Sequence, residues 1–268
     1  MPRFDERDTM FARAERSPET PEYDEYYQRN PDVRVVDDRI RKLPALLQTG
    51  GRYYDEVESK RAEQYFSAID ELTIEKDVLE KTVRQLTDSQ DLSDVLSAVT
   101  LELGAVASGT TSVRPEFVYS QKGRFDADYG RVIDASTRSW AVVFLVEMDH
   151  SAMSRAPRAP TIVESAHQYL RAARIAKTIE AALKRIGVEA QAQFDAHYEV
   201  ILPALAVDAG LGEVGRNNIL IADRFGSRVR IGAVTCDREL RQASPVDLGM
   251  RRFCEVCKKC SENCPTGS

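Results

Sequence analysis

Apolar residues from Glu56 to about Gln90 recur at spacings of three, four and seven, which is typical of an amphipathic helix. The positions are Tyr65, Ile69, Leu72, Leu79, Val83 and Leu86. No Pro or Gly interrupts the segment, so we predict one helix through it and a shorter helix over 91–106. Residues 1–55 are charged and rich in Pro and Tyr, and they predict a surface arm with short helices.

After residue 110 the pattern becomes that of strands. EFVYS (116–120) and SWAVVFLVEM (139–148) are β-rich, and the long apolar run in the second predicts a strand buried on both faces. Further strands are predicted over 188–196, 217–222 and 227–234. Two more helices are predicted, one over 161–186 that ends at Gly187 and one over 199–209 with Pro203 in its first turn.

Strands mixed with helices of unequal length predict an α+β fold. We expect three parts along the chain. An arm and helices occupy 1–110, an α+β domain occupies 111–250, and a small cysteine-rich domain begins over 251–268.

Composition and charge exclude several classes of protein. The chain has 268 residues, of which 43% are hydrophobic and 30% are charged, as in ordinary globular proteins. Its net charge of -6 argues against nucleic acid as a partner. No apolar run approaches the roughly 20 residues of a membrane-spanning helix. The polar N-terminus has no apolar segment of a signal peptide and no adjacent arginine pair, so we expect a cytoplasmic protein.

Four of the five cysteines lie in one short run, CEVCKKCSENCP (254–265). The spacing Cys-x2-Cys-x2-Cys-x3-Cys-Pro is that of bacterial ferredoxins, in which the fourth cysteine binds the other of two clusters. A four-cysteine zinc site usually separates its CxxC pairs by about 15–20 residues, and a thioredoxin-like CxxC does not explain four cysteines. The run therefore predicts iron–sulfur ligands, with zinc as the alternative. The predicted ligands are Cys254, Cys257, Cys260 and Cys264.

The remaining cysteine, Cys236, is predicted to be a small buried residue. Because a 4Fe-4S cluster takes four thiolates, the run alone completes neither of two clusters. We therefore expect the sequence to be truncated relative to a longer protein, or to need a partner chain that supplies the missing thiolates. We also expect the 268-residue chain to be inactive alone.

Residues 210–215 read GLGEVG, a formal match to the dinucleotide-binding motif G-x-G-x-x-G. That motif needs a strand before it and a helix after it, whereas here a predicted helix precedes and a predicted strand follows. Nicotinamide binding is therefore rejected. The glycines are better explained by a sharp turn with close backbone approach to a neighbour or to a flat ligand.

The longer string AGLGEVGRNNILIADRFGSRVRIGAV (209–234), followed by FCEVCKKCSENCP, resembles the corrinoid-dependent reductive dehalogenases, whose relatives include the epoxyqueuosine reductases. The charged arm and GGRYYD (50–55) resemble cytoplasmic members of that family. Glu213 favours the dehalogenase branch, because epoxyqueuosine reductases tend to carry Trp there.

The resemblance implies a nitroreductase-like α+β domain that binds cobalamin and a ferredoxin-like domain with two 4Fe-4S clusters. It implies that an external donor such as ferredoxin or flavodoxin sends electrons through the clusters to cobalt, which removes halide from a small organohalide. It also implies that the glycine turn contacts the cofactor. The residues of that turn are Gly210, Gly212, Gly215, Arg216 and Asn217.

The resemblance further implies a proton-donating Tyr with basic or amide-bearing helpers, and it maps the Tyr onto Tyr169. A Tyr has an unperturbed pKa of about 10 and is therefore protonated at neutral pH. Arg230 would favour its phenolate by opposite charge. The third position falls on His197, where the family more often carries Asn or Lys. Each residue also has a plain structural alternative: core packing for Tyr169, a surface pair of Arg228 and Arg230, and a hydrogen-bonded His197.

Asp195 and His197 also begin a D-x-H-x-x-G pattern, by which some proteins give cobalamin a His ligand, but Val200 stands where Gly is needed. We therefore reject that motif. Three functions remain open: a reductive dehalogenase, a reductase related to epoxyqueuosine reductase that acts on a non-halogenated substrate, and an inactive or electron-transfer fragment.

Overall fold

Two long strands form the centre of the structure, a computed structural model that describes residues 2–45, 47–88, 91–124 and 126–263. Strand β2 (Trp140–Glu147) pairs antiparallel with β6 (Val229–Cys236) along its whole length. Strands β1 (Ala107–Ser112) and β3 (Ala190–Gln193) complete an antiparallel sheet in the order β1-β2-β6-β3. A mixed helix-and-sheet architecture is therefore confirmed.

Strand β2 has apolar side chains on both faces, because its apolar run leaves no polar position to face water. Val142 and Phe144 pack into one core, and Val143 and Leu145 pack into a second core on the other face. All four residues are fully buried. The prediction of a strand buried on both faces is confirmed.

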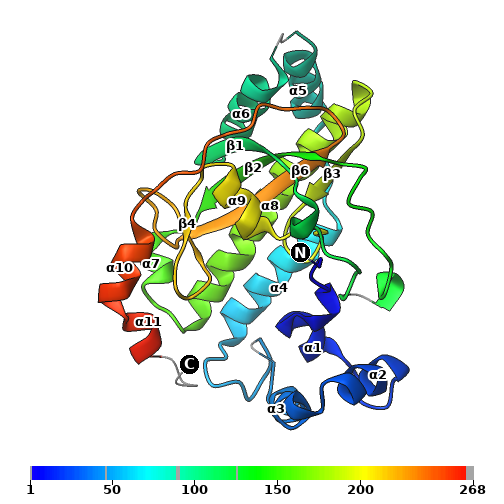
Figure 1. Cartoon of the computed structure of the whole chain (residues 1–268). Coiled ribbons are helices and arrows are strands. Elements are labelled where there is room, and N and C mark those ends of the chain that lie inside the picture. Colours follow the sequence, from blue (N-terminus) through cyan, green and yellow to red (C-terminus); the bar gives the residue numbers. More distant parts are fainter. Residues whose placement is uncertain (1, 46, 89–90, 125, 264–268) are drawn as a thin grey trace.

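The first core is covered by the long helix α8 (Ala159–Arg185) together with α4 (Glu56–Asp70) and α5 (Lys76–Asp88). Figure 1 shows α4 beside α8 below the sheet. Helix α8 starts two residues before its predicted position, with a Pro in its first turn, and Gly187 follows its end at a positive φ of 79°, as predicted. Helix α9 (Leu202–Asp208) packs in the second core, with Pro203 in its first turn.

The single helix predicted from Glu56 to Gln90 is wrong, because the chain turns between α4 and α5. A straight helix of that length would extend about 50 Å at 1.5 Å per residue and leave much of its apolar face without a partner. The turn lets both halves pack against α8, while Leu72 and Ile74 within it still contact the core. Helix α6 (Leu92–Glu102) follows close to its predicted position.

The strand predicted over 116–120 is also wrong. Pro115 starts a single 3-10 turn, Pro115–Phe117, and Val118 forms only an isolated bridge to Val200. The peptide groups bond to the loop before α9 instead of to the sheet, with Ile201 N donating to Phe117 O at 2.8 Å. The helix predicted from 199 consequently starts at Leu202. The strand predicted over 217–222 is shorter than expected: only β5 (Leu220–Ile221) forms there, paired with β4 (Glu213–Val214).

The N-terminal arm forms short helices, as predicted, which appear in blue in Figure 1. They are α1 (Met10–Glu15), α2 (Pro21–Arg29) and α3 (Pro31–Arg41). Before them, the fully buried Glu6 accepts a bond from Gly123 N at 2.8 Å and pairs with Lys122 at 3.3 Å. A Cβ at Gly123 would lie 2.3 Å from Arg7 N, so only glycine allows this approach.

The remaining short helices are α7 (His150–Met153), α10 (Met250–Cys257) and α11 (Lys259–Glu262). None of the described helices combines the length and the apolar composition that a membrane span requires. The boundary at residue 110 stays a prediction, although α4 and α5 share one core with the sheet.

Leu183 lies on the buried face of α8 and is fully buried. We expect Leu183→Ala to lower the free energy of unfolding by about 2–5 kcal/mol, because removing this side chain leaves a cavity in the core. Leu101→Ala is the matched control, since Leu101 in α6 is 47% exposed and should change stability little. Chemical denaturation monitored by circular dichroism measures both, and equal losses would contradict the core described above.

Candidate functional site

A cavity of about 400 Å³ lies at the end of the sheet where β6 begins. The loop that leaves β3 closes one side of it, and α8 contributes a tyrosine from beneath. Its lining is Phe11, Tyr119, Tyr169, Asp195, Tyr198, Val200, Leu202, Pro203, Asn218, Ile219, Leu220, Val229, Arg230 and Ile231. The cavity is thus mostly apolar, with four aromatic rings and a few polar groups, as is typical of small-molecule sites.

The structure brings Tyr169 and Arg230 together in this cavity. The Arg230 guanidinium carbon lies 4.7 Å from the centre of the Tyr169 ring. Arg230 also donates to Ser165 Oγ at 2.7 Å, which fixes the guanidinium against α8. Burial and the charge of Asp195 raise the pKa of Tyr169 above 10, and the opposing charge of Arg230 does not outweigh them. Tyr169 is therefore protonated at neutral pH and able to donate.

Asp195 is an ionisable cavity residue that we did not predict as a site residue. It follows β3, and burial raises its pKa above the usual value, against the opposing charges of Arg124, Arg230 and His197. A carboxyl group with a raised pKa can hold and release a proton closer to neutral pH than an ordinary Asp. The D-x-H pattern at 195–197 could have pointed to Asp195 as a site residue, but the family resemblance mapped the third site position onto His197.

His197 does not line the cavity that contains Tyr169 and Arg230. Its ring stacks on Phe194 at 5.0 Å and lines a neighbouring cavity of about 410 Å³. The ring lies 3.6 Å from Asp70 on α4, and its side chain is 45% exposed. Burial lowers the pKa of His197 below 6.5, and the charge of Asp70 only partly offsets this. The proposed catalytic role of His197 stays a prediction.

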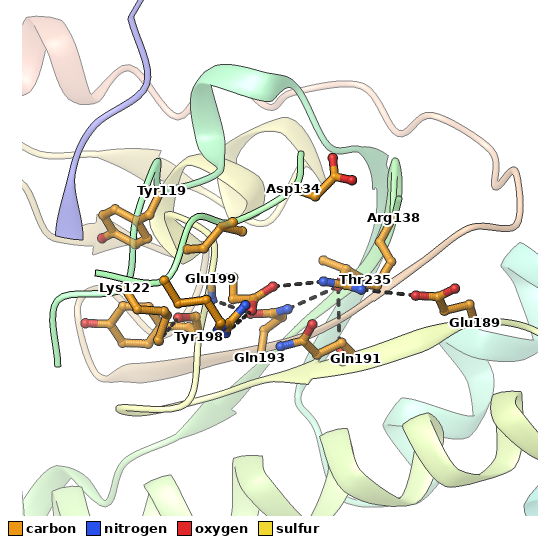
Figure 2. Close-up of polar contacts among 12 residues, drawn as sticks. Tyr119, Lys122, Asp134, Arg138, Glu189, Gln191, Gln193, Tyr198, Glu199 and Thr235 are labelled. Atoms are coloured by element: carbon orange, nitrogen blue, oxygen red, sulfur yellow. Dashed lines mark hydrogen bonds and ion pairs between the residues drawn. The ribbon is translucent and has the colours of Figure 1, made fainter. Parts of the chain in front are cut away.

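Glu199 fixes the loop that carries Asp195 and Tyr198. Its carboxylate accepts bonds from Arg131 and Arg138, both at 2.8 Å. Its backbone N–H donates to Gln193 Oε1 at 2.7 Å. Figure 2 shows Glu199 at the centre of these contacts, with Arg138 reaching both Glu199 and Glu189.

Glu199 also connects the loop to Tyr119, on another wall of the cavity that contains Tyr169. The Glu199 carbonyl accepts a hydrogen bond from Tyr119 N at 2.9 Å. Burial alone would raise the pKa of Glu199, but bonds from Arg131 and Gln191 and the charge of Arg138 hold it below 4.5. Glu199 is thus a buried, charged carboxylate at neutral pH, with a partner for each oxygen.

The N-terminal arm supplies the outer wall. Phe11 of α1 lines the cavity, and the Arg124 guanidinium lies 5.3 Å from its ring centre. Arg124 also pairs with Glu15 at 3.0 Å and hydrogen-bonds the Tyr198 hydroxyl. The arm, which the sequence predicted only as a surface segment, therefore takes part in the candidate site.

The predicted glycine turn is packed mainly against the chain itself. A Cβ at Gly210 would lie 2.6 Å from Ser244 O, and one at Gly212 would lie 2.3 Å from Ile221 O. At Gly215 the nearest atom would be Asn217 Oδ1, at 3.0 Å. The close approaches therefore explain Gly210 and Gly212 without a ligand.

The end of this turn reaches towards both the cavity and the cysteines. Arg216 and Asn217 are exposed, whereas the next residue, Asn218, lines the cavity. Arg216 N donates to Cys254 Sγ at 3.5 Å. Glu213 accepts from Met250 N at 3.1 Å, and so holds the start of α10 against the turn.

Three of the predicted metal ligands are described. Cys254 and Cys257 lie on α10, one turn apart, and Cys260 lies on α11; all three thiols are free. Cys264 lies outside the described residues. Thiols at this spacing suit a cluster in chemical type, but among the residues that are described no three His, Cys, Asp or Glu side chains gather closely enough to hold a metal ion.

Cys236, by contrast, is fully buried in β6. Burial raises the pKa of its thiol to about 11. The prediction that this cysteine is a small buried residue is confirmed.

Comparison with known proteins gives the family. A tetrachloroethene reductive dehalogenase of Desulfitobacterium hafniense is 35% identical over 142 residues, which are 53% of this chain and 25% of that protein. The corresponding enzyme of Sulfurospirillum multivorans is 43% identical over 63 residues, which are 24% of this chain and 13% of that protein. These similarities support assignment of the chain to the corrinoid-dependent reductive dehalogenase family.

Solved structures agree with this assignment, although no family model matches the chain. A reductive dehalogenase described with a B12-dependent mechanism superposes with a TM-score of 0.63 at 26% identity, over 80% of this chain and 32% of that one. A catabolic reductive dehalogenase gives 0.60 at 28% identity, over 68% of this chain and 26% of that one. The chain spans about a quarter of the length of the first curated relatives.

An epoxyqueuosine reductase of Lactococcus garvieae is also similar, at 36% identity over 63 residues, which are 24% of this chain and 17% of that protein. Both branches of the predicted resemblance are therefore found among the proteins to which this chain is similar.

We expect Glu199→Gln to lower the free energy of unfolding at pH 7 by about 1–3 kcal/mol, because two arginines lose a charged acceptor. Since folding depresses the pKa of Glu199, its contribution is fully present above about pH 4.5 and is lost as pH falls through the folded pKa. The difference between wild type and variant should therefore shrink in acid. Denaturation at pH 7 and pH 3 measures this.

Glu116→Gln is the control for that series, because Glu116 forms an ion pair with Arg114 at 3.6 Å and both side chains are more than a third exposed. Its effect should stay within about 0.5 kcal/mol. If Glu199→Gln and Glu116→Gln have the same free energy of unfolding, the described contacts of Glu199 with the two arginines do not stabilise the fold.

In the metal-free protein at pH 8, iodoacetamide should label Cys254, Cys257 and Cys260 but not Cys236, because the reactive species is the thiolate. Cys236 should react only after unfolding, since it is buried and its pKa is about 11. Peptide mass spectrometry reads out each site. Native labelling of Cys236 at the rate of Cys260 would show that β6 is not packed as described.

Proposed function

We propose that this chain is the proton-donating part of a reductive dehalogenase-like oxidoreductase that replaces halide by hydrogen on an organohalide. The observation that carries the proposal is the placement of Tyr169 against Arg230 in one mostly apolar cavity. The relatives named as reductive dehalogenases support the reaction class.

Within that reaction the protein must deliver a proton to the carbon that loses halide. Tyr169 holds a proton at neutral pH, because burial and Asp195 raise its pKa. Arg230 lies on the ring and lowers the cost of the phenolate that remains. The apolar lining excludes competing water, and Phe11, Tyr119 and Tyr198 offer faces for a flat or apolar substrate.

The family implies two kinds of cofactor, cobalamin and a pair of 4Fe-4S clusters, which would supply the electrons. Cys254, Cys257, Cys260 and Cys264 are the groups of this chain that would hold iron, since their type and spacing suit it. The glycine turn and Arg216 and Asn217 remain the proposed cofactor contacts. An external one-electron donor such as ferredoxin or flavodoxin is part of the proposal.

A second candidate is a reductase acting on a non-halogenated substrate such as an epoxide. Asp195 favours it, because a carboxyl group with a raised pKa could protonate a departing oxygen. Comparing turnover of brominated phenols with that of an epoxide-bearing nucleoside in tRNA separates the two reactions. Turnover of the latter alone would replace the first proposal by the second.

The test of the main proposal uses the full-length protein, reconstituted without oxygen with iron, sulfide and cobalamin. Tyr169→Phe should lower kcat for halide release about 10²–10⁴-fold, because it removes the general acid but keeps the ring. Tyr65→Phe is the control, since Tyr65 stacks on His167 outside the cavity. An unaffected Tyr169→Phe enzyme, or a protein that takes up neither corrinoid nor iron, would refute the proposal.

A further inference from the structure

One short loop, residues 195–198, separates two cavities. Asp195 lines the cavity with Tyr169, while Ala196 and His197 line the neighbouring cavity, and Tyr198 lines both. The alternation requires a sharp turn, and Ala196 adopts a positive φ of 62° there. Phe194 and His197 exchange backbone bonds at 3.2 and 3.0 Å across this turn.

The proposed reaction creates a need that the first cavity alone does not meet. Each turnover takes one proton from Tyr169, and that proton must be replaced before the next turnover. Tyr169 is half-buried and its ring lies against Arg230, so direct exchange of its hydroxyl with bulk water is restricted. His197, in the same loop, is 45% exposed.

We propose that His197 is the entrance of a proton relay that runs through Asp195 to Tyr169, and this proposal rests on the proposed function. After Tyr169 has given its proton to carbon, the Asp195 carboxylate takes a proton from the His197 imidazolium, directly or through water, and passes it to the phenolate. His197 is recharged from solvent, and the electrons of the reaction come separately from the low-potential donor.

Charged and polar groups from several elements lie around the relay. Asp70 on α4, Lys177 on α8 and Lys122 face His197. Arg124 and Arg230, together with the hydroxyls of Tyr169 and Tyr198, surround Asp195.

Burial raises the pKa of Asp195 and lowers that of His197, so it brings the two groups closer in proton affinity. The phenolate of Tyr169 is the strongest base of the three, which makes it the end point of the transfer.

The first test measures kcat and KM in the reconstituted full-length enzyme at pH 7. His197→Gln should lower kcat about tenfold or more with KM unchanged, and added imidazole should restore most of the loss. His167→Gln is the matched control, because His167 is also half-exposed, near a carboxylate, and outside both cavities. It should leave kcat unchanged.

If the His197→Gln enzyme turns over like the His167→Gln enzyme, the relay is wrong even though the dehalogenase proposal stands. If the wild type releases no halide from any organohalide, the proposed function fails instead.

A second test needs neither cofactor nor activity. The chain has three histidines, so proton NMR can titrate each imidazole separately. Asp195→Asn should lower the pKa of His197 by removing a nearby negative charge, while the titrations of His150 and His167 stay unchanged. An unchanged His197 titration would overturn the relay whatever the enzyme does.

Discussion

The candidate site depends on one buried carboxylate, Glu199, and on the two arginines that neutralise it. A charge inside a protein is tolerated only when its partners replace the water that it has lost. Arg131 and Arg138 do so from the long connection between β1 and β2, and Gln193 holds the backbone of Glu199 from β3. The loop with Asp195 and Tyr198 is therefore held by polar bonds on one side and faces an apolar cavity on the other.

Burial is the second constraint, and it shifts the pKa values of neighbouring groups in opposite directions. It raises the pKa of Asp195 and of Tyr169 and lowers that of His197, because in each case it disfavours the charged form. The proton affinities of Asp195 and His197 thus move closer together, whereas that of the Tyr169 phenolate moves further above both. The charge of Arg230 lowers the pKa of Tyr169, in the direction expected from the sequence, but it does not reverse the effect of burial.

Much of the scaffold could be predicted from the sequence. The apolar run of β2 and the span of α8 up to Gly187 were evident, because burial and backbone conformation constrain residue types strongly there. The break between α4 and α5 was not evident, since it depends on where α8 lies. Pro115 was an available warning against the strand at 116–120, because it fixes φ and lacks a donor.

The site could be predicted only in part. Tyr169 and Arg230 lie 61 positions apart, and the family resemblance placed them in one site, as the structure does. Asp195 was missed in favour of His197, because neighbouring loop residues can face different cavities. A sequence motif does not show which of the two residues faces the cavity with Tyr169. The contribution of Phe11 was also missed, since it requires the arm to fold back over residues distant in sequence.

The bond from Arg216 N to Cys254 Sγ places a cysteine within a few backbone atoms of the cavity that contains Tyr169. Arg216 is two residues before Asn218, which lines that cavity, and Glu213 fastens the same hairpin to the start of α10. A displacement of that sulfur, by oxidation, alkylation or binding of an ion, would therefore act on a peptide group only two residues from the cavity wall. A change at the thiols of α10 would reach the candidate site through this one short backbone segment.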